Sequence, residues 1–178
     1  MERVPYQATV GASGYPNLRL PVSILLDNVR SMYNVGAFFR TGDGAGIERL
    51  LLSGITARPP KNGITKTALG AENRVPWKPI DNVADEITEL RAAGYEIAAI
   101  ETSMRAVDIF DWRPSFPVCV LFGHEVDGLA PELLAASDTH VRIPMLGLKH
   151  SLNVASAGAV VMYELLRKYR ALHQMTVE

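Results

Sequence analysis

The sequence has little cysteine, little net charge and no long apolar run. Cys119 is the only cysteine among 178 residues, which excludes an internal disulfide and a cysteine-rich metal site. Its position within the apolar run VCVLF favours a core residue over a nucleophile. No stretch approaches the length of a membrane span, and the amino-terminal segment lacks the apolar part of a signal peptide. We therefore expect a cytoplasmic protein without a membrane partner or a metal.

The composition is that of an ordinary globular domain. Hydrophobic residues make up 48% of the chain and charged residues 21%, and no linker, repeat or low-complexity tract interrupts it. We expect one domain over residues 21–173, preceded by a lead segment, 1–20, and followed by a tail, 174–178.

The formal charge is only −1, but basic residues gather between residues 58 and 78. Arg58, Lys61, Lys66, Arg74 and Lys78 there meet a single acid, Glu72. Such an uneven distribution permits a basic face that binds RNA, and an ordinary solvated surface explains it equally well.

Apolar runs alternate with helical patterns along the chain. Strands are expected at residues 21–28, 47–54, 95–102, 118–123 and 140–145. Helices are expected from Asn34 to about Gly46, from Asp81 or Asn82 to Gly94, over 130–138, and from Ser151 to about His173. Residues 55–80, with four prolines, are expected to form a long loop. Strands that are apolar throughout predict an α/β fold whose parallel sheet is covered on both faces.

The segment NVGAFFR (34–40) is a first candidate site. Gly36 and Arg40 are four residues apart, so on a helix they share one face. The glycine would leave room for an anion beside the guanidinium, with Asn34 at the mouth of the helix. An exposed arginine on a loosely packed helix explains the segment as well.

Two glycine-containing turns lead to different conclusions. GDGAG (42–46) follows a helix rather than a strand, so a dinucleotide-binding turn is excluded. FGHEVDGL (122–129) follows an apolar strand, where the ligands of parallel sheets bind, and carries Glu125 between two glycines. His124 and His140 have no spacing typical of metal ligands.

The segment IPMLGLKHSLNVASAGAVV (143–161) joins a strand, a loop and a helix of small residues. Ser151 stands where a helix N-cap is expected, and Gly158 predicts close packing against another element or a ligand. A tightly packed core helix explains the small residues but not the polar Ser151 and Asn153 at its mouth.

Together these three segments resemble the motifs of the SpoU (TrmH-type) branch of the SPOUT RNA methyltransferases. NVGAFFR is similar to the first motif, Asn-x-Gly-x-x-x-Arg, and FGHEVDGL to the second, Gly-x-Glu-x-x-Gly. IPMLGLKHSLNVASA is similar to the third, and the order agrees over roughly residues 20–170.

The resemblance implies a fold that general rules of topology do not suggest. In this family the carboxy-terminal chain passes through a loop and forms a deep trefoil knot, and the proteins are homodimers with the active site near the interface. The implied cofactor is S-adenosyl-L-methionine. By analogy it is bound by three loops, which contain Thr102, Leu121, Gly123, Ile143, Met145, Ser151 and Leu152.

The implied reaction is methyl transfer to a ribose 2'-hydroxyl of RNA, with tRNA as the favoured substrate. Arg40 matches the family's catalytic arginine, and we expect it to fix a phosphate and stabilise the developing alkoxide, since a guanidinium rarely gives up a proton. Asn34, Glu125, Ser151 and Asn153 match the polar residues that shape the site. Arg40, Lys61, Lys66 and Arg74 are the predicted RNA contacts, because the chain resembles members without an extra RNA-binding domain.

Three alternatives remain open on the sequence: the same reaction on rRNA, a non-catalytic RNA-binding relative, and methylation of a base. Retention of the polar residues together argues against a non-catalytic protein, and the Asn-x-Gly-x-x-x-Arg segment favours ribose.

Overall fold

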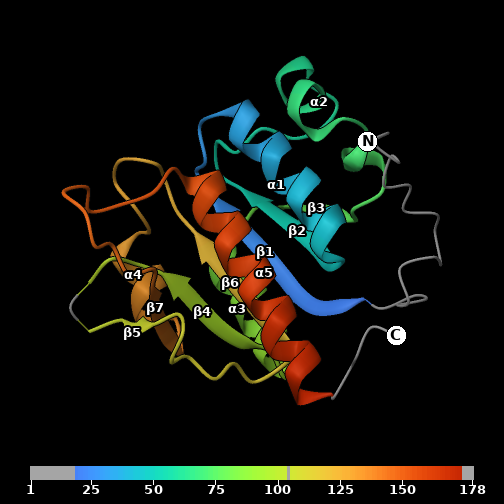
Figure 1. Ribbon diagram of the computed structural model, residues 1–178. Helices are drawn as coiled ribbons and strands as arrows, with labels where there is room; N and C mark the ends of the chain where they lie inside the picture. The colour runs from blue at the N-terminus through green and yellow to red at the C-terminus, as the bar shows by residue number, and fades with distance from the viewer. Residues whose placement is uncertain (1–18, 104, 174–178) are drawn as a thin grey trace, which may run out of the picture.

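A parallel β-sheet forms the centre of the computed structural model, which describes residues 19–103 and 105–173 (Figure 1). Most of the predicted lead segment and the whole predicted tail lie outside the described residues. The described strands pair in the order β3-β2-β1-β6-β4-β7-β5. They are β1 (Leu20–Asp27), β2 (Ile47–Ser53), β3 (Trp77–Ile80), β4 (Glu96–Ile100), β5 (Val107–Asp108), β6 (Val118–Phe122) and β7 (Thr139–Arg142).

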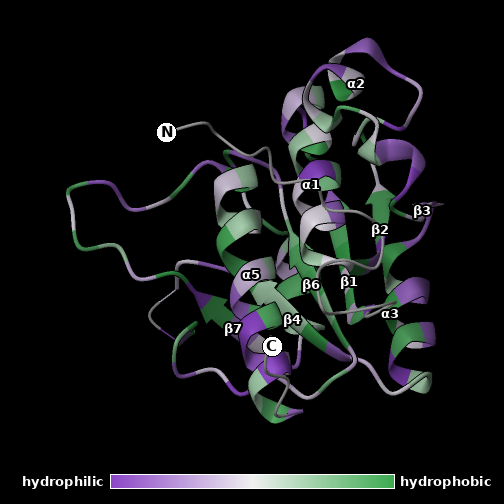
Figure 2. Ribbon diagram, turned by 45° about the vertical axis from the view of Figure 1, so that its right-hand side comes forward, coloured by the Kyte–Doolittle hydropathy of each residue, from purple (hydrophilic) through white to green (hydrophobic). Residues whose placement is uncertain are grey.

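Helices cover both faces of this sheet. They are α1 (Met32–Ala45), α2 (Asn62–Ala68), the short 3-10 helix η1 (Ala71–Asn73), α3 (Val83–Ala92), α4 (Pro131–Ala135) and α5 (Val154–Leu172). Strand residues alternate between two cores: Ile24 and Leu26 pack with α1 and α5, and Leu25 packs with α3 and α4. Figure 2 shows the apolar strands between helices that carry both polar and apolar residues. The predicted parallel α/β fold is confirmed.

The chain changes direction within the sheet between β1 and β6. From β1 it continues through α1 to β2 on one side, and from β6 through α4 to β7 on the other. In open parallel sheets, ligands bind at the carboxyl ends of the strands near such a change of direction.

Three expectations about local structure were wrong. Residues 55–80 form α2, η1 and β3 rather than a long loop, because Ile64 and Ala68 are buried against α1. Helix α1 begins earlier, with Ser31 as its N-cap, and α5 begins later, with Asn153 as its N-cap. Neither Asn34 nor Ser151 therefore caps a helix.

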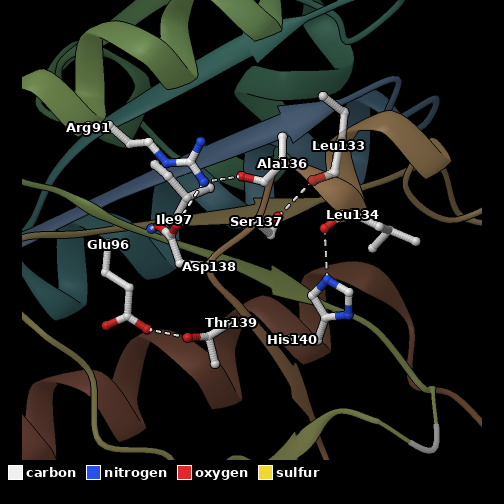
Figure 3. A network of polar contacts seen from close by, with 10 residues as sticks. All are labelled: Arg91, Glu96, Ile97, Leu133, Leu134, Ala136, Ser137, Asp138, Thr139 and His140. Carbon is white, nitrogen blue, oxygen red and sulfur yellow. Dashed lines mark hydrogen bonds and ion pairs between the residues drawn. The ribbon is translucent and has the colours of Figure 1, made fainter.

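A network of polar contacts joins β4, β7 and α3 at the far edge of the sheet (Figure 3). Asp138 accepts hydrogen bonds from the Ile97 amide at 2.8 Å and from the Arg91 guanidinium at 2.7 Å. Thr139 donates to Glu96 at 2.8 Å, and the ring of His140 bonds the carbonyl of Leu134 at 2.8 Å. These contacts fix the start of β7 and leave its carboxyl end for the site.

Helix α5 returns from the far edge of the sheet and packs on α1 (Figure 1). A Cβ at Gly158 would lie 2.3 Å from the ring of Phe38, so the predicted close packing is against α1 of the same chain. Lys168 of α5 also donates to the carbonyls of Phe110 and Trp112, which ties the helix to the segment between β5 and β6. This path is compatible with the trefoil knot, which stays a prediction.

No helix within residues 19–103 and 105–173 is both long and apolar enough to cross a membrane.

Candidate active site

A cavity of about 340 Å³ opens at the carboxyl ends of β4, β6 and β7. Its walls are the segment after β4, the turn 122–128 after β6, and the loop and first turn of α5 that follow β7. The lining combines apolar side chains with carboxylates, among them Ile100, Phe122, Ile143, Glu101 and Glu125. A size above 300 Å³ and such a mixed lining are typical of sites for small organic ligands.

Glu125 is the centre of the polar contacts at one end of this cavity. Its carboxylate accepts hydrogen bonds from the amides of Arg30 at 3.0 Å and Ser31 at 3.1 Å. It also accepts one from the side-chain amide of Asn34 at 3.1 Å. The turn after β6 is thereby joined to the start of α1.

The electrostatics of Glu125 follow from these donors. Partial burial alone would raise the pKa of Glu125, but the hydrogen bonds from Arg30, Ser31 and Asn34 outweigh it and lower the pKa below its ordinary value. The carboxylate is therefore stabilised in its charged form, as an anchor rather than a proton donor.

Asn34 connects this anchor to the carboxy-terminal helix. Its side-chain oxygen accepts a hydrogen bond from the side-chain amide of Asn153 at 3.2 Å. The oxygen of Asn153 in turn accepts from the backbone of Ala155 at 2.9 Å and Ser156 at 3.3 Å, which caps α5. We call Glu125, Asn34 and Asn153 the polar chain. It joins residues of all three sequence motifs.

Two glycines allow elements to approach closely beside the site. A Cβ at Gly123 would lie 2.3 Å from the carbonyl carbon of Gly128, which closes the turn 123–128 on itself. A Cβ at Gly36 would lie 2.1 Å from the Thr67 hydroxyl oxygen. The expectation that Gly36 leaves room for an anion beside Arg40 was wrong, because α2 fills that space.

The structure brings most of the predicted site residues together. Thr102, Gly123, Glu125, Ile143, Met145, Ser151 and Leu152 line the cavity. Leu121 instead has its side chain in the core beneath α3, with no exposed surface. Arg40 is exposed on α1 and does not line the cavity. Lys61 at the N-cap of α2, Lys66 within α2 and Arg74 after η1 are also exposed.

Several lining residues escaped the sequence reasoning. Glu101 directly follows β4, and His124 and His150 also face the cavity. The sequence did contain a signal for Glu101, because this carboxylate follows the end of a buried strand. The backbone amides of Arg30 and Ser31 could not be found from side-chain patterns at all.

The histidines have partners other than a metal. His124 Nδ1 lies 2.9 Å from Asp127 and 3.1 Å from the amide of that residue. Over the described ranges 19–103 and 105–173, no three His, Cys, Asp or Glu side chains are grouped so as to hold a metal ion.

This parallel sheet, with its cavity at the strand ends and three motifs joined by hydrogen bonds, is the architecture of a SPOUT-type methyltransferase domain. The SpoU rRNA Methylase family matches residues 21–163, and the chain belongs to that family.

Named relatives include enzymes of both tRNA and rRNA. The tRNA (guanosine(18)-2'-O)-methyltransferase of Escherichia coli (strain K12) is 30% identical over 147 residues, which cover 83% of this chain and 63% of that protein. The AdoMet-bound rRNA methyltransferase from Sinorhizobium meliloti is 31% identical, with a TM-score of 0.78 over 87% of this chain and 57% of that one. The chain spans about three fifths of the length of the curated relatives that it matches first.

A further solved structure concerns the 2-OH methylation of C/U34 on tRNA. It is 26% identical, with a TM-score of 0.73, and the match covers 86% of this chain and 97% of that one.

Proposed function

We propose that the protein is an S-adenosylmethionine-dependent RNA ribose 2'-O-methyltransferase with tRNA as its favoured substrate. The observation that carries the proposal is the polar chain. It links the three motifs beside one cavity, and the turn of Glu125 and the start of α5 also line that cavity. The family and the relatives named above support the reaction class, and two of them concern tRNA.

The residues present fit the proposed cofactor. Ile100, Ile143 and Met145 offer an apolar surface for a base, and Glu101 offers hydrogen-bond acceptors within the same cavity. A solved relative with AdoMet bound supports this assignment. When bound, S-adenosylmethionine supplies an activated methyl group on a sulfonium.

The side chains of the site orient the acceptor and stabilise charge. Glu125 holds the start of α1 through the Arg30 and Ser31 amides, which fixes Asn34. Asn34 and Ser151 then position the ribose, and Arg40 binds the adjacent phosphate and stabilises the alkoxide that forms at the 2'-oxygen. The hydroxyl proton passes to that phosphate or to water.

The position of Arg40 supports a homodimer. Arg40 is exposed on α1 and lies outside the cavity lining of its own chain. Exposed apolar side chains on α1 and α5, namely Tyr33, Val160 and Tyr163, suit a subunit interface. We propose that the second subunit supplies Arg40 to the cavity.

Co-expression of two impaired variants tests this arrangement. If each site combines residues of two chains, mixed dimers of Arg40→Ala and Glu125→Ala subunits contain one intact site and recover part of the activity. Failure of the mixed dimers to recover any activity would contradict a shared site, while the homodimers of each variant serve as controls.

The basic residues of α2 and η1 are proposed RNA contacts. Arg58 and Lys78 lie near acids, 3.9 Å from Asp81 and 2.7 Å from Glu86. Lys61, Lys66 and Arg74 are exposed and form no ion pair within the described residues. Reversing these three charges should flatten the salt dependence of RNA binding, because each lost phosphate contact removes a release of counterions. The exposed Arg113 provides a control reversal. An unchanged slope in the triple variant would remove these residues from the interface.

The function is tested with labelled S-adenosylmethionine and separate pools of tRNA and rRNA. Nucleoside digestion should then place the label on a ribose 2'-oxygen of tRNA, and label in rRNA would select the alternative substrate. Transfer to a base, or to no RNA in either pool, would overturn the proposal. A cytoplasmic location stays a prediction.

A further inference from the structure

The carboxylate of Glu101, which lines the cavity, accepts hydrogen bonds from the described residues at only one of its two oxygens. Glu101 is partly buried at the end of β4. Its Oε1 accepts hydrogen bonds from the Thr102 amide at 2.7 Å and from the Thr102 hydroxyl at 3.3 Å. Within residues 19–103 and 105–173, neither a hydrogen-bond donor nor a cation of the protein reaches Oε2.

The unused oxygen lies close to the turn after β6. A Cβ built on Gly128 would lie 3.7 Å from Glu101 Oε2. Glu101 and Gly128 both line the cavity, and Gly128 has a φ of +72°, which a residue with a side chain rarely adopts. The carboxylate of Glu101 therefore lies beside the turn after β6, and both face the same cavity.

The polar chain determines which part of the cofactor comes near Glu101. The acceptor ribose has to meet the methyl group near Asn34, Glu125 and Asn153, which lie in the first turn of α1, in the turn after β6 and at the start of α5. The opposite end of the cofactor then lies by β4 and β7, where Ile100, Ile143 and Met145 form an apolar wall. A carboxylate beside a base-binding wall is suited to accept hydrogen bonds from a ribose diol.

We propose that Glu101 binds the ribose hydroxyls of S-adenosylmethionine, with Oε2 as the acceptor and Oε1 held by Thr102. This assignment rests on the proposed function. It gives Glu101 and Glu125 different roles, because both oxygens of Glu125 already accept hydrogen bonds from its own chain.

The test compares two ligands on several proteins by calorimetry. The ligands are S-adenosylhomocysteine and its analogue without the two ribose hydroxyls. The proteins are the full chain, Glu101→Ala, and Glu101→Gln, which keeps an oxygen for Thr102. Glu132→Gln, an exposed carboxylate on α4 outside the cavity, is the matched control. Thermal melting verifies that each variant folds.

The affinity lost when the ligand lacks its ribose hydroxyls and the affinity lost in Glu101→Ala should not add. Hydrogen bonds to a charged group contribute strongly to affinity. The full chain should therefore bind the analogue about tenfold more weakly than S-adenosylhomocysteine, or worse. Glu101→Ala should bind S-adenosylhomocysteine with a similar loss of affinity. Glu101→Ala should then bind the analogue with no further loss, whereas Glu132→Gln should behave as the full chain.

Each other outcome has a distinct meaning. A Glu101→Ala variant that binds S-adenosylhomocysteine as tightly as the full chain overturns the assignment and leaves the proposed function intact. Equal weakening of both ligands by Glu101→Ala also overturns it, because that pattern indicates a purely structural role or contact with another part of the ligand. A full chain that binds neither ligand overturns the proposed cofactor, and the assignment with it.

Discussion

The two sides of the cavity are held in place by different means. On one side, the polar chain joins Asn34 to Glu125, which lies 91 positions away in the sequence. It also joins Asn34 to Asn153, which lies 119 positions away. On the other side residues 143–152, which we call the strap, connect β7 to α5. In the described part of the chain, no hydrogen bond ends on the strap, and Leu146 is 100% and Leu148 96% exposed.

This difference indicates how the site works. The residues of the polar chain are held by hydrogen bonds within the protein, which lowers the entropic cost of reaching the reactive arrangement. The strap extends away from the sheet as a loop (Figure 1) and has no hydrogen bond to break among the described residues, so it can adjust when the cofactor enters. Four predictions test the comparison, from the largest expected effect to the smallest.

Removal of the anchor should have the largest effect. Glu125→Ala leaves the Arg30 and Ser31 amides and the Asn34 side chain without their acceptor, so the start of α1 loses its position. We expect methyl transfer to slow by about 100-fold, the scale of a small misplacement of reacting groups. Single-turnover assays measure this loss with Glu132→Ala as the control. A rate within a few-fold of the unmodified protein would show that the anchor is dispensable.

Two glycine substitutions compare the two sides of the cavity by their effect on the free energy of unfolding. Gly123→Ala places a Cβ 2.3 Å from backbone of the same turn, so the free energy of unfolding should fall by about 1–3 kcal/mol. Gly147→Ala in the strap meets no atom within 4 Å, and its effect should stay within about 0.5 kcal/mol. Denaturant unfolding measures both. Equal losses in the two variants would contradict the contrast between an ordered turn and an open strap.

Acid should weaken the polar chain. Because the folded-state pKa of Glu125 is lowered, its stabilisation is fully present above the ordinary value of 4.5 and is lost as the pH falls through the folded-state pKa. The difference in unfolding free energy between the unmodified protein and Glu125→Gln should therefore be constant near neutrality and shrink in acid. A difference that stays constant down to the lowest pH at which both proteins fold would exclude this linkage.

Polar replacement of the strap leucines should have the smallest effect. Leu146→Ser combined with Leu148→Ser removes apolar groups that are already in water, so the free energy of unfolding should change by less than about 0.5 kcal/mol. Chemical denaturation without cofactor is the measurement. A clear loss would mean that these leucines pack against a part of the protein, in one chain or across a dimer.

Sequence patterns predicted the buried elements well. The strands at β1, β2, β4, β6 and β7 and the helices α3 and α4 were found within a few residues, because long apolar runs and Asn82 as an N-cap are local signals. Residues 55–80 were misread because their prolines and charges suggested a loop. Helix α2 forms there by packing Ile64 on α1, a contact that local composition does not carry.

The site residues were predicted mainly through the resemblance. Order and spacing of three motifs selected Thr102, Gly123, Glu125, Ile143 and Ser151, all of which line the cavity. Leu121 was placed correctly on β6, but its side chain faces the core beneath α3 because side chains alternate along a strand. Gly36 was interpreted as space for an anion, although it is space for Thr67.

By itself the sequence determined the parallel α/β class and the family, because apolar runs and motifs can be recognised without knowing which residues are in contact. Only the tertiary structure decided how the motifs cooperate. Hydrogen bonds between Glu125, Asn34 and Asn153 depend on the order of β1 and β6 and on the return of α5, and no pattern within one segment encodes that order. The position of Arg40 outside the cavity, and of Glu101 within it, was decided in the same way.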